Sequence, residues 1–248
     1  MKLIHLAELK VQKIFVTATL AVRLEGIFKC ELGLLADTYI IRDRSNQPQI
    51  GYHVLDFDKK QCTPTKLVLA VLQFFENFTT DRKTIIFCPS IEMVETLGKL
   101  IKDSAISHSR MQSDVKDAEE RKWFQGTCDT LIGTTGVTHG IDAPDVALVI
   151  MVEQLFGFTN IFQAAGRAGR DGNPAFATYL HNVNKQFPSP RSTHDFEAFR
   201  EGKLLVKTKQ CRWIIISQFL DGIAMTCADL HGAVLCDVCS ADNNLTIG

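Results

Sequence analysis

The chain has 248 residues, of which 46% are hydrophobic and 22% are charged, a composition typical of a protein that folds around a buried core. Its formal net charge of −1 excludes a strong overall attraction to nucleic acid, so any such contact must come from a local group of Lys or Arg. No apolar run approaches the roughly 20 residues that span a bilayer, and the first ten residues lack the layout of a signal peptide. We therefore expect an intracellular protein with no membrane partner.

The middle of the chain alternates strand-like and helix-like segments. Continuous apolar runs predict strands at Lys83–Cys88, Thr130–Thr134, Val146–Val152 and 175–180, and shorter patterns predict strands at 13–17 and Ile50–Phe57. Helical spacing predicts helices at 64–78, 91–101, 113–125 and 160–168, with Pro64 at the first position, Ser90 as an N-cap and Gly126 after a C-terminus. Apolar strands that alternate with helices are typical of a doubly wound α/β domain with a parallel sheet.

The pattern changes after Leu180. Residues 182–193 are polar and contain two prolines, which indicates a linker. The remainder, 194–248, is predicted to be helical up to about Leu220 and then rich in loops and cysteine.

The segment from Gln163 to Gly172 reads QAAGRAGRDG. Arg167 and Arg170 are three positions apart and would share one face if the segment were helical. Guanidinium groups bind phosphate in bidentate fashion, and an Arg from a second domain stabilises the charge on a transferring γ-phosphate in many NTPases. The alternative is a glycine-rich helix end with solvated arginines.

This string resembles the sixth motif of superfamily-two helicases, and its GRAGRDG core is close to the RecQ family. Residues 134–146 (TTGVTHGIDAPDV) resemble the fifth motif, although Val137-Thr138-His139-Gly140 stands where RecQ members often have Phe-Gly-Met-Gly. Residues 85–90 (IIFCPS) resemble the fourth motif, 42–50 the inter-lobe stretch and 17–20 (TATL) the third motif. The resemblance covers most of the chain in the family's order.

The resemblance implies an ATP-dependent 3′→5′ DNA helicase of DNA recombination and repair, nuclear in a eukaryote and cytoplasmic otherwise. Arg170, as the better arginine finger, and Arg167 would complete the ATP site from across a cleft. Gln163, Gly140 and Asp142 would bind nucleotide or couple the two sites, and the alternative for Asp142 is a carboxylate that simply caps a turn. Thr134, Thr135 and Ser90 would contact DNA phosphates.

Cysteine crowds into the last fifth of the chain. Four of the eight cysteines are scattered, and we interpret them as small core residues, because disulfides are rare in a reducing compartment. The others follow the pattern C-x15-C-x8-C-x2-C, at Cys211, Cys227, Cys236 and Cys239. A redox C-x-x-C is the alternative, but it expects a βαβ context that is absent here. The cluster resembles the RecQ zinc module and predicts a structural Zn²⁺ site, with His231 as a possible substitute for Cys227.

The predicted architecture is a RecA-like doubly wound parallel sheet with helices on both faces, followed by a small helical zinc-binding subdomain. Residues 1–50 would be a first-lobe remnant and inter-lobe linker, 51–181 the second RecA-like domain, 182–193 a linker and 194–248 the zinc-binding part.

The chain contains neither a G-x-x-x-x-G-K-[ST] phosphate loop nor an acidic box for Mg²⁺, both of which belong to the family's first lobe. We therefore expect no ATP turnover by the chain alone. ATP and Mg²⁺ would bind only together with a complete first lobe. If the chain is not a fragment, that first lobe would be a separate partner. A second hypothesis is a non-catalytic DNA- or protein-binding module derived from a helicase lobe. A third, an RNA helicase or chromatin-remodelling motor, is disfavoured by GRAGRDG together with the terminal cysteines.

Overall fold

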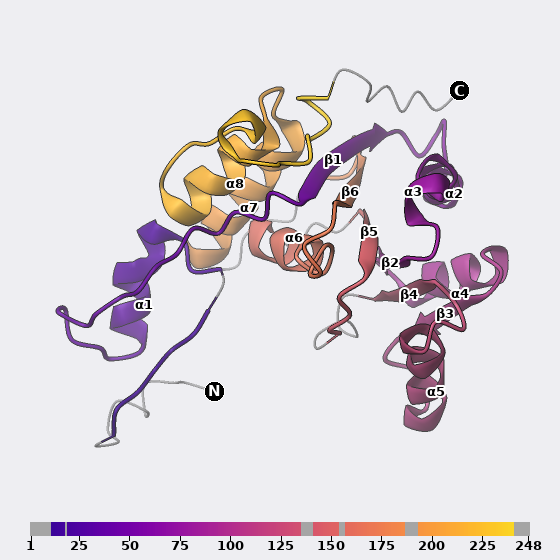
Figure 1. The fold of residues 1–248 in the computed structure, drawn as a ribbon, viewed down its shortest axis with the longest axis horizontal. Helices are drawn as coiled ribbons and strands as arrows, with labels where there is room; N and C mark the ends of the chain where they lie inside the picture. Colours follow the sequence, from indigo (N-terminus) through magenta and orange to yellow (C-terminus); the bar gives the residue numbers. More distant parts are fainter. Residues whose placement is uncertain (1–10, 18, 135–140, 154–156, 187–192, 241–248) are drawn as a thin grey trace.

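The computed structural model describes residues 11–17, 19–134, 141–153, 157–186 and 193–240. At its centre is one six-stranded sheet in the order β1-β6-β5-β2-β4-β3, and every neighbouring pair of strands is parallel (Figure 1). The strands are β1 (Ile50–Phe57), β2 (Lys83–Cys88), β3 (Ser104–Ser107), β4 (Thr130–Thr134), β5 (Val146–Val152) and β6 (Ala175–Asn182).

Alternate side chains of the central strands enter two separate apolar cores, because successive residues of a strand point to opposite faces. On β5, Val149 and Met151 join one core, whereas Leu148 and Ile150 join the other. All seven residues of β5 are buried, which explains the continuous apolar run in the sequence. The sheet is therefore covered on both faces, as the doubly wound prediction requires.

The helices divide between these two cores. The core that contains Leu148 is completed by α2 (Pro64–Phe74) and α4 (Ile91–Leu100), near the short α3 (Glu76–Thr79). The core that contains Val149 receives side chains from α5 (Ser113–Phe124), α6 (Phe158–Ala165), α7 (Thr193–Lys207) and α8 (Arg212–Asp221). The last two helices and the short η3 (Cys227–Asp229) thus pack onto the sheet as part of the same hydrophobic core.

Local signals in the sequence placed several of these elements correctly. Pro64 is at the start of α2, the Ser90 hydroxyl caps α4 by accepting a hydrogen bond from the Met93 N–H, and Gly126 follows α5 with a φ of 73°. Three predicted helices need correction, and one strand was missed. The helix predicted over 64–78 is broken at Phe75, the one over 160–168 ends at Ala165, the C-terminal helix divides at 208–211, and β3 was not predicted. With four residues, β3 is too short to give a clear periodic signal.

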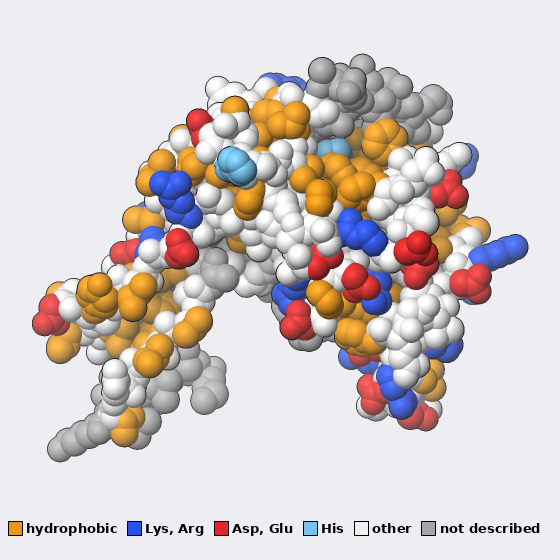
Figure 2. Space-filling view, viewed as in Figure 1, with side chains coloured by type: hydrophobic (Ala, Val, Ile, Leu, Met, Phe, Trp, Pro, Cys, Tyr) orange, Lys and Arg blue, Asp and Glu red, His pale blue; other side chains and the backbone are white. Residues whose placement is uncertain are grey.

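An arm made of residues 11–17 and 19–47 projects from the sheet and carries the short η2 (Val22–Leu24) and α1 (Glu25–Glu31) (Figure 1). The strand predicted at 13–17 is wrong: within the described residues this stretch pairs with no other strand, and Ile14 and Val16 are 79% and 91% exposed. A β-patterned stretch needs a neighbouring strand for its backbone hydrogen bonds. In Figure 2, hydrophobic side chains gather on this arm, whereas positive and negative side chains are interspersed over the body. Among the described residues, no helix is long and apolar enough to cross a membrane.

Candidate functional site

The arginine-rich segment forms a series of turns that begins where α6 ends, at Ala165. The segment is therefore not helical at Arg167 and Arg170, and the condition under which they would share a helix face is not met. Gly169 has a φ of 62°, a conformation that favours glycine, and its N–H donates to the Val146 carbonyl at 2.9 Å. The Asp171 N–H donates to the Pro144 carbonyl at 3.1 Å. Residues 166–172, called the arginine loop below, are thus held by backbone hydrogen bonds beside the amino end of β5.

Both arginines point to the segment that precedes β5. The Arg167 guanidinium donates to the Ile141 carbonyl at 2.7 Å, and Arg170 forms an ion pair with Asp142 and donates to the Gly166 carbonyl. Burial, and next the nearby Arg170 charge, lower the pKa of Arg167, yet an arginine this far above neutrality stays charged. The Asp142 side chain is 80% exposed and that of Arg170 is 34% exposed, so a ligand has access to this pair. The two motifs that the sequence singled out are therefore in direct contact.

The sequence reasoning did not identify Gln49, which anchors the arginine loop from the other side. Its side-chain amide donates to the Gly169 carbonyl at 3.1 Å, and its backbone carbonyl accepts from the Ala175 N–H at 2.8 Å. The only available signal was its place in the stretch that resembles the inter-lobe segment. Gln163 is exposed on α6, before the loop, and Gly140 lies outside the described residues.

Ser90 and Thr134, the described residues predicted to contact phosphates, follow or end neighbouring strands at the opposite edge of the sheet. Thr134 is in register with Cys88, two residues before Ser90, so both lie at the carboxyl edge. The Ser90 oxygen accepts from the Met93 N–H at 3.3 Å, which leaves its hydroxyl hydrogen able to donate to an anion at the start of α4. Thr135 lies outside the described residues.

The chain between these two regions joins opposite edges of the sheet. Because β4 and β5 point the same way, Thr134 lies at the carboxyl edge and Val146 at the amino edge. The fifth-motif segment, of which residues 134 and 141–146 are described, therefore connects the Ser90 and Thr134 region to the arginine loop.

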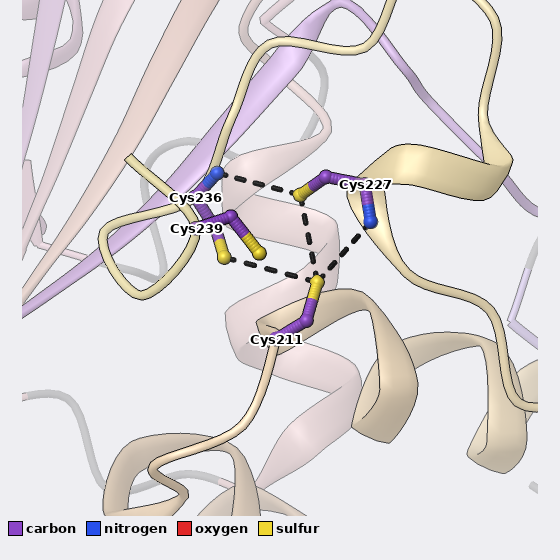
Figure 3. A group of neighbouring side chains, drawn as sticks. All are labelled: Cys211, Cys227, Cys236 and Cys239. Carbon is purple, nitrogen blue, oxygen red and sulfur yellow. Dashed lines mark hydrogen bonds between the residues drawn. The ribbon is translucent and has the colours of Figure 1, made fainter. Parts of the chain in front are cut away.

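The four clustered cysteines meet with their sulfur atoms facing one another (Figure 3). All four sulfurs lie within 4.8 Å of one another, with Cys211 to Cys227 at 3.5 Å and Cys211 to Cys236 at 3.9 Å. Thiolates around one Zn²⁺ at about 2.3 Å are about 3.8 Å apart at tetrahedral corners. The four residues therefore fit a metal ion of this kind. His231 is exposed and does not belong to the group, so the geometry favours Cys227 over His231.

Backbone N–H groups point at these sulfurs and favour thiolates. The N–H groups of Cys227, Arg212 and Cys236 donate to the sulfurs of Cys211, Cys236 and Cys227 at 3.2, 3.5 and 3.4 Å. Hydrogen bonds from Cys211 and Cys227 lower the pKa of Cys236, whereas burial raises the pKa of Cys239 to about 12. A divalent cation would compensate the repulsion between several thiolates at this spacing.

A largely buried ion pair attaches residues 227–239, called the cysteine loop below, to the sheet. Arg212 binds Asp237 through two hydrogen bonds of 2.8 and 2.7 Å, and it also donates to the Leu205 carbonyl at 2.7 Å. The Asp237 N–H donates to the Tyr52 carbonyl, and its carboxylate accepts from the Val54 N–H. The loop thereby covers the outer side of β1, an edge strand whose outward-facing backbone groups would otherwise lack partners in the sheet. Asp237 was not singled out from the sequence.

Comparison with known proteins agrees with this geometry. Residues 66–172 match the family described as the helicase conserved C-terminal domain. The chain is 28% identical over 152 residues to the putative ATP-dependent DNA helicase Q1 of Caenorhabditis briggsae, covering 60% of this chain and 24% of that protein. It is 26% identical over 136 residues to the ATP-dependent DNA helicase Q-like 2 of Arabidopsis thaliana, covering 52% and 19%.

A structure of Dbp5 from S. cerevisiae bound to RNA and ADP BeF3 has the same fold, with a TM-score of 0.55 at 17% identity, over 77% of this chain and 48% of that one. Residues 66–172 of this chain therefore match a helicase C-terminal domain, and the shared fold agrees with that match. In sequence the chain is similar to DNA helicases of the RecQ type. It spans a quarter or less of the length of the curated relatives described above.

Substituting the two loop glycines by alanine should have unequal effects. At Gly169 a Cβ would lie 2.9 Å from Gln49 Cγ and 3.1 Å from the Asn173 carbonyl oxygen, whereas at Gly172 it would meet nothing within 4 Å. Both positions have positive φ, so each substitution costs about 1 kcal/mol from the backbone alone. We expect Gly169→Ala to lower the free energy of unfolding by a further 1–3 kcal/mol, roughly the cost of overpacking. Urea denaturation of both variants measures this, and equal losses would contradict it.

One Zn²⁺ per chain should be found by native mass spectrometry. We expect Cys236→Ser to lose the metal and to make the region after Lys207 sensitive to protease, because so short a loop-rich segment depends on its metal. The control variants His231→Ala and Cys128→Ser lie outside the cluster and should keep the metal. Metal-free wild-type protein with an intact tail would refute the prediction.

Proposed function

We propose that this chain is the second motor lobe of an ATP-dependent DNA helicase of the RecQ type, which moves 3′→5′ during recombination and repair. A first lobe, on the same polypeptide or a separate one, supplies the phosphate loop and the Mg²⁺ ligands. The observation that carries the proposal is the contact between Arg170 and Asp142 at one edge of the sheet, joined by the fifth-motif segment to Ser90 and Thr134 at the other. We place the protein in the nucleus of a eukaryotic cell, or in the cytoplasm of a prokaryotic one.

On the nucleotide side, Arg170 is the arginine finger. Its present partner is an exposed carboxylate, so closure onto ATP in a first lobe exchanges Asp142 for the γ-phosphate as the ligand of the guanidinium. Both partners are anionic oxygens that accept bidentate hydrogen bonds, which makes the exchange chemically conservative. Arg167 remains on the Ile141 carbonyl and positions the loop, while Gln163 and Gly140 complete the interface with the nucleotide.

On the nucleic-acid side, Ser90, Thr134 and Thr135 contact phosphates of one DNA strand. Such contacts carry no sequence information, which suits a motor that translocates along any sequence. The cysteine cluster holds Zn²⁺ as a structural ion that fixes the last helices and the cysteine loop against β1.

A non-catalytic binding module is the second candidate. One observation favours it: in this lobe Arg170 already has a carboxylate partner, so the loop is satisfied without a nucleotide. The two candidates differ in whether a first lobe confers ATP hydrolysis that depends on Arg170.

The test is a fusion in which the first lobe of the C. briggsae relative precedes residue 17 of this chain. We expect the chain alone to hydrolyse no ATP and the fusion to hydrolyse ATP when single-stranded DNA is added. Arg170→Ala should lower that rate by roughly 10³-fold, the typical contribution of an arginine finger. Arg121→Ala on the exposed face of α5 is the matched control and should leave it unchanged.

DNA-stimulated hydrolysis by the 248-residue chain itself would show that the first lobe is not required. A folded fusion that binds DNA without hydrolysing ATP would instead favour the binding module.

A further inference from the structure

A buried carboxylate lies directly after β5, at the carboxyl edge of the sheet. Glu153 is only 3% exposed, and its two oxygens bind Lys59 at 2.9 Å and Lys185 at 3.1 Å. The Asn182 amide donates to the same carboxylate at 3.3 Å. These side chains follow or end three adjacent strands, β1, β6 and β5, so the group lies along one part of the carboxyl edge.

The lysines face solvent while the carboxylate does not. Their side chains are 51% and 40% exposed, against 2% for that of Glu153. Burial acts to raise the pKa of Glu153, but the hydrogen bonds from Lys59 and Lys185 outweigh it and lower the pKa below its ordinary value. The carboxylate therefore stays ionised, and the trio carries one net positive charge on its outer side. Each ammonium group has three hydrogens, so Lys59 keeps two that Glu153 does not accept, and Lys185, which also donates to the Glu153 backbone carbonyl at 3.5 Å, keeps one.

The backbone at Glu153 is held in an unfavourable conformation. Its φ is 49°, a left-handed value that is uncommon outside glycine, and its N–H donates to the Leu180 carbonyl at 3.0 Å. Such strain persists where the surrounding structure imposes it, and it concentrates at binding sites. At this position the Glu153 side chain contacts both lysines at the edge of the sheet.

This edge is also the one that carries Ser90 and Thr134. The strand order β1-β6-β5-β2-β4 places the lysine pair, Ser90 and Thr134 in one row. Neighbouring strands are about 4.8 Å apart, so the row is about 20 Å long. A row of hydroxyl and ammonium donors along one edge matches the spaced anions of a nucleic-acid backbone.

We propose that Lys59 and Lys185 form a phosphate-binding subsite that extends the strand contact of Ser90 and Thr134 across β5, β6 and β1, with Glu153 as a positioning residue. This inference rests on the proposed function, because it assumes that a nucleic-acid strand runs along this edge. The competing explanation is a purely structural ion network. It gains support from two acids nearby: Asp56 pairs with His181 at 2.8 Å, and the Asp58 carboxylate accepts from the Lys60 N–H.

The test is fluorescence anisotropy of the full chain with a labelled oligothymidylate over a range of salt concentrations. We expect Lys59→Gln and Lys185→Gln each to weaken binding and to reduce the slope of log K against log salt by about 0.7, the value for one single-strand phosphate contact. Lys59→Arg should retain most of the affinity. Lys122→Gln is the matched control, because Lys122 is 54% exposed, pairs with Glu119 and lies near the other end of β4. It should change neither quantity.

Glu153→Gln separates positioning from simple charge. The variant loses one negative charge, so its net charge rises by one. An attraction set by net charge alone predicts tighter binding of the oligothymidylate, whereas loss of lysine positioning predicts weaker binding. A thermal melt identifies variants that fail to fold. If Ser90→Ala and Thr134→Ala weaken binding but the lysine variants keep the wild-type slope, the subsite is refuted and the proposed function stands. If the wild-type chain does not bind the oligothymidylate, the DNA contact of the proposed function is refuted, and the subsite that rests on it is refuted as well.

Discussion

The parallel direction of all six strands is the constraint on which the rest of the structure depends. Every strand ends at one edge of the sheet and begins at the other, so residues distant in sequence lie at the same edge when they occupy the same end of their strands. Ser90, Thr134 and Glu153 lie along the carboxyl edge because each follows or ends a strand. The arginine loop lies at the amino edge because its backbone bonds to residues that open β5. In open α/β sheets, ligands bind at the carboxyl edge, which agrees with the proposed strand contact there.

The arginine loop and the cysteine loop depend on the same short stretch before β1. Pro48 accepts a hydrogen bond from the Val234 N–H of the cysteine loop at 2.8 Å, and the next residue, Gln49, holds the Gly169 carbonyl. Arg212 and Asp237 then fix the cysteine loop along the rest of β1. Since removal of one partner from a buried ion pair leaves the other uncompensated, this attachment tolerates little change. A metal bound at the cysteines would therefore support more than the tail.

The sequence predicted the parts of the fold whose signals are local. Four strands have the predicted bounds, three from continuous apolar runs that end at polar or turn residues and one, Ile50–Phe57, from a shorter pattern, and Ser90 caps its helix as expected. The helix predicted through Ala168 failed because three glycines in the segment favour turns, and Gly169 requires a positive φ. The strand predicted at 13–17 failed because strand formation depends on a neighbour that local pattern does not reveal.

Pairings between distant residues were the least predictable part of the site. The four cysteines were identified by spacing and chemistry, since a metal needs several thiolates. By contrast, the Asp142 pairing with Arg170, the Asp237 pairing with Arg212 and the Glu153 pairing with two lysines join residues 25 or more positions apart. A charged residue in a sequence is usually solvated, so nothing local distinguishes these from surface charges. What distinguishes Glu153 is its place directly after a fully buried strand, where a charge must find partners from neighbouring strand ends.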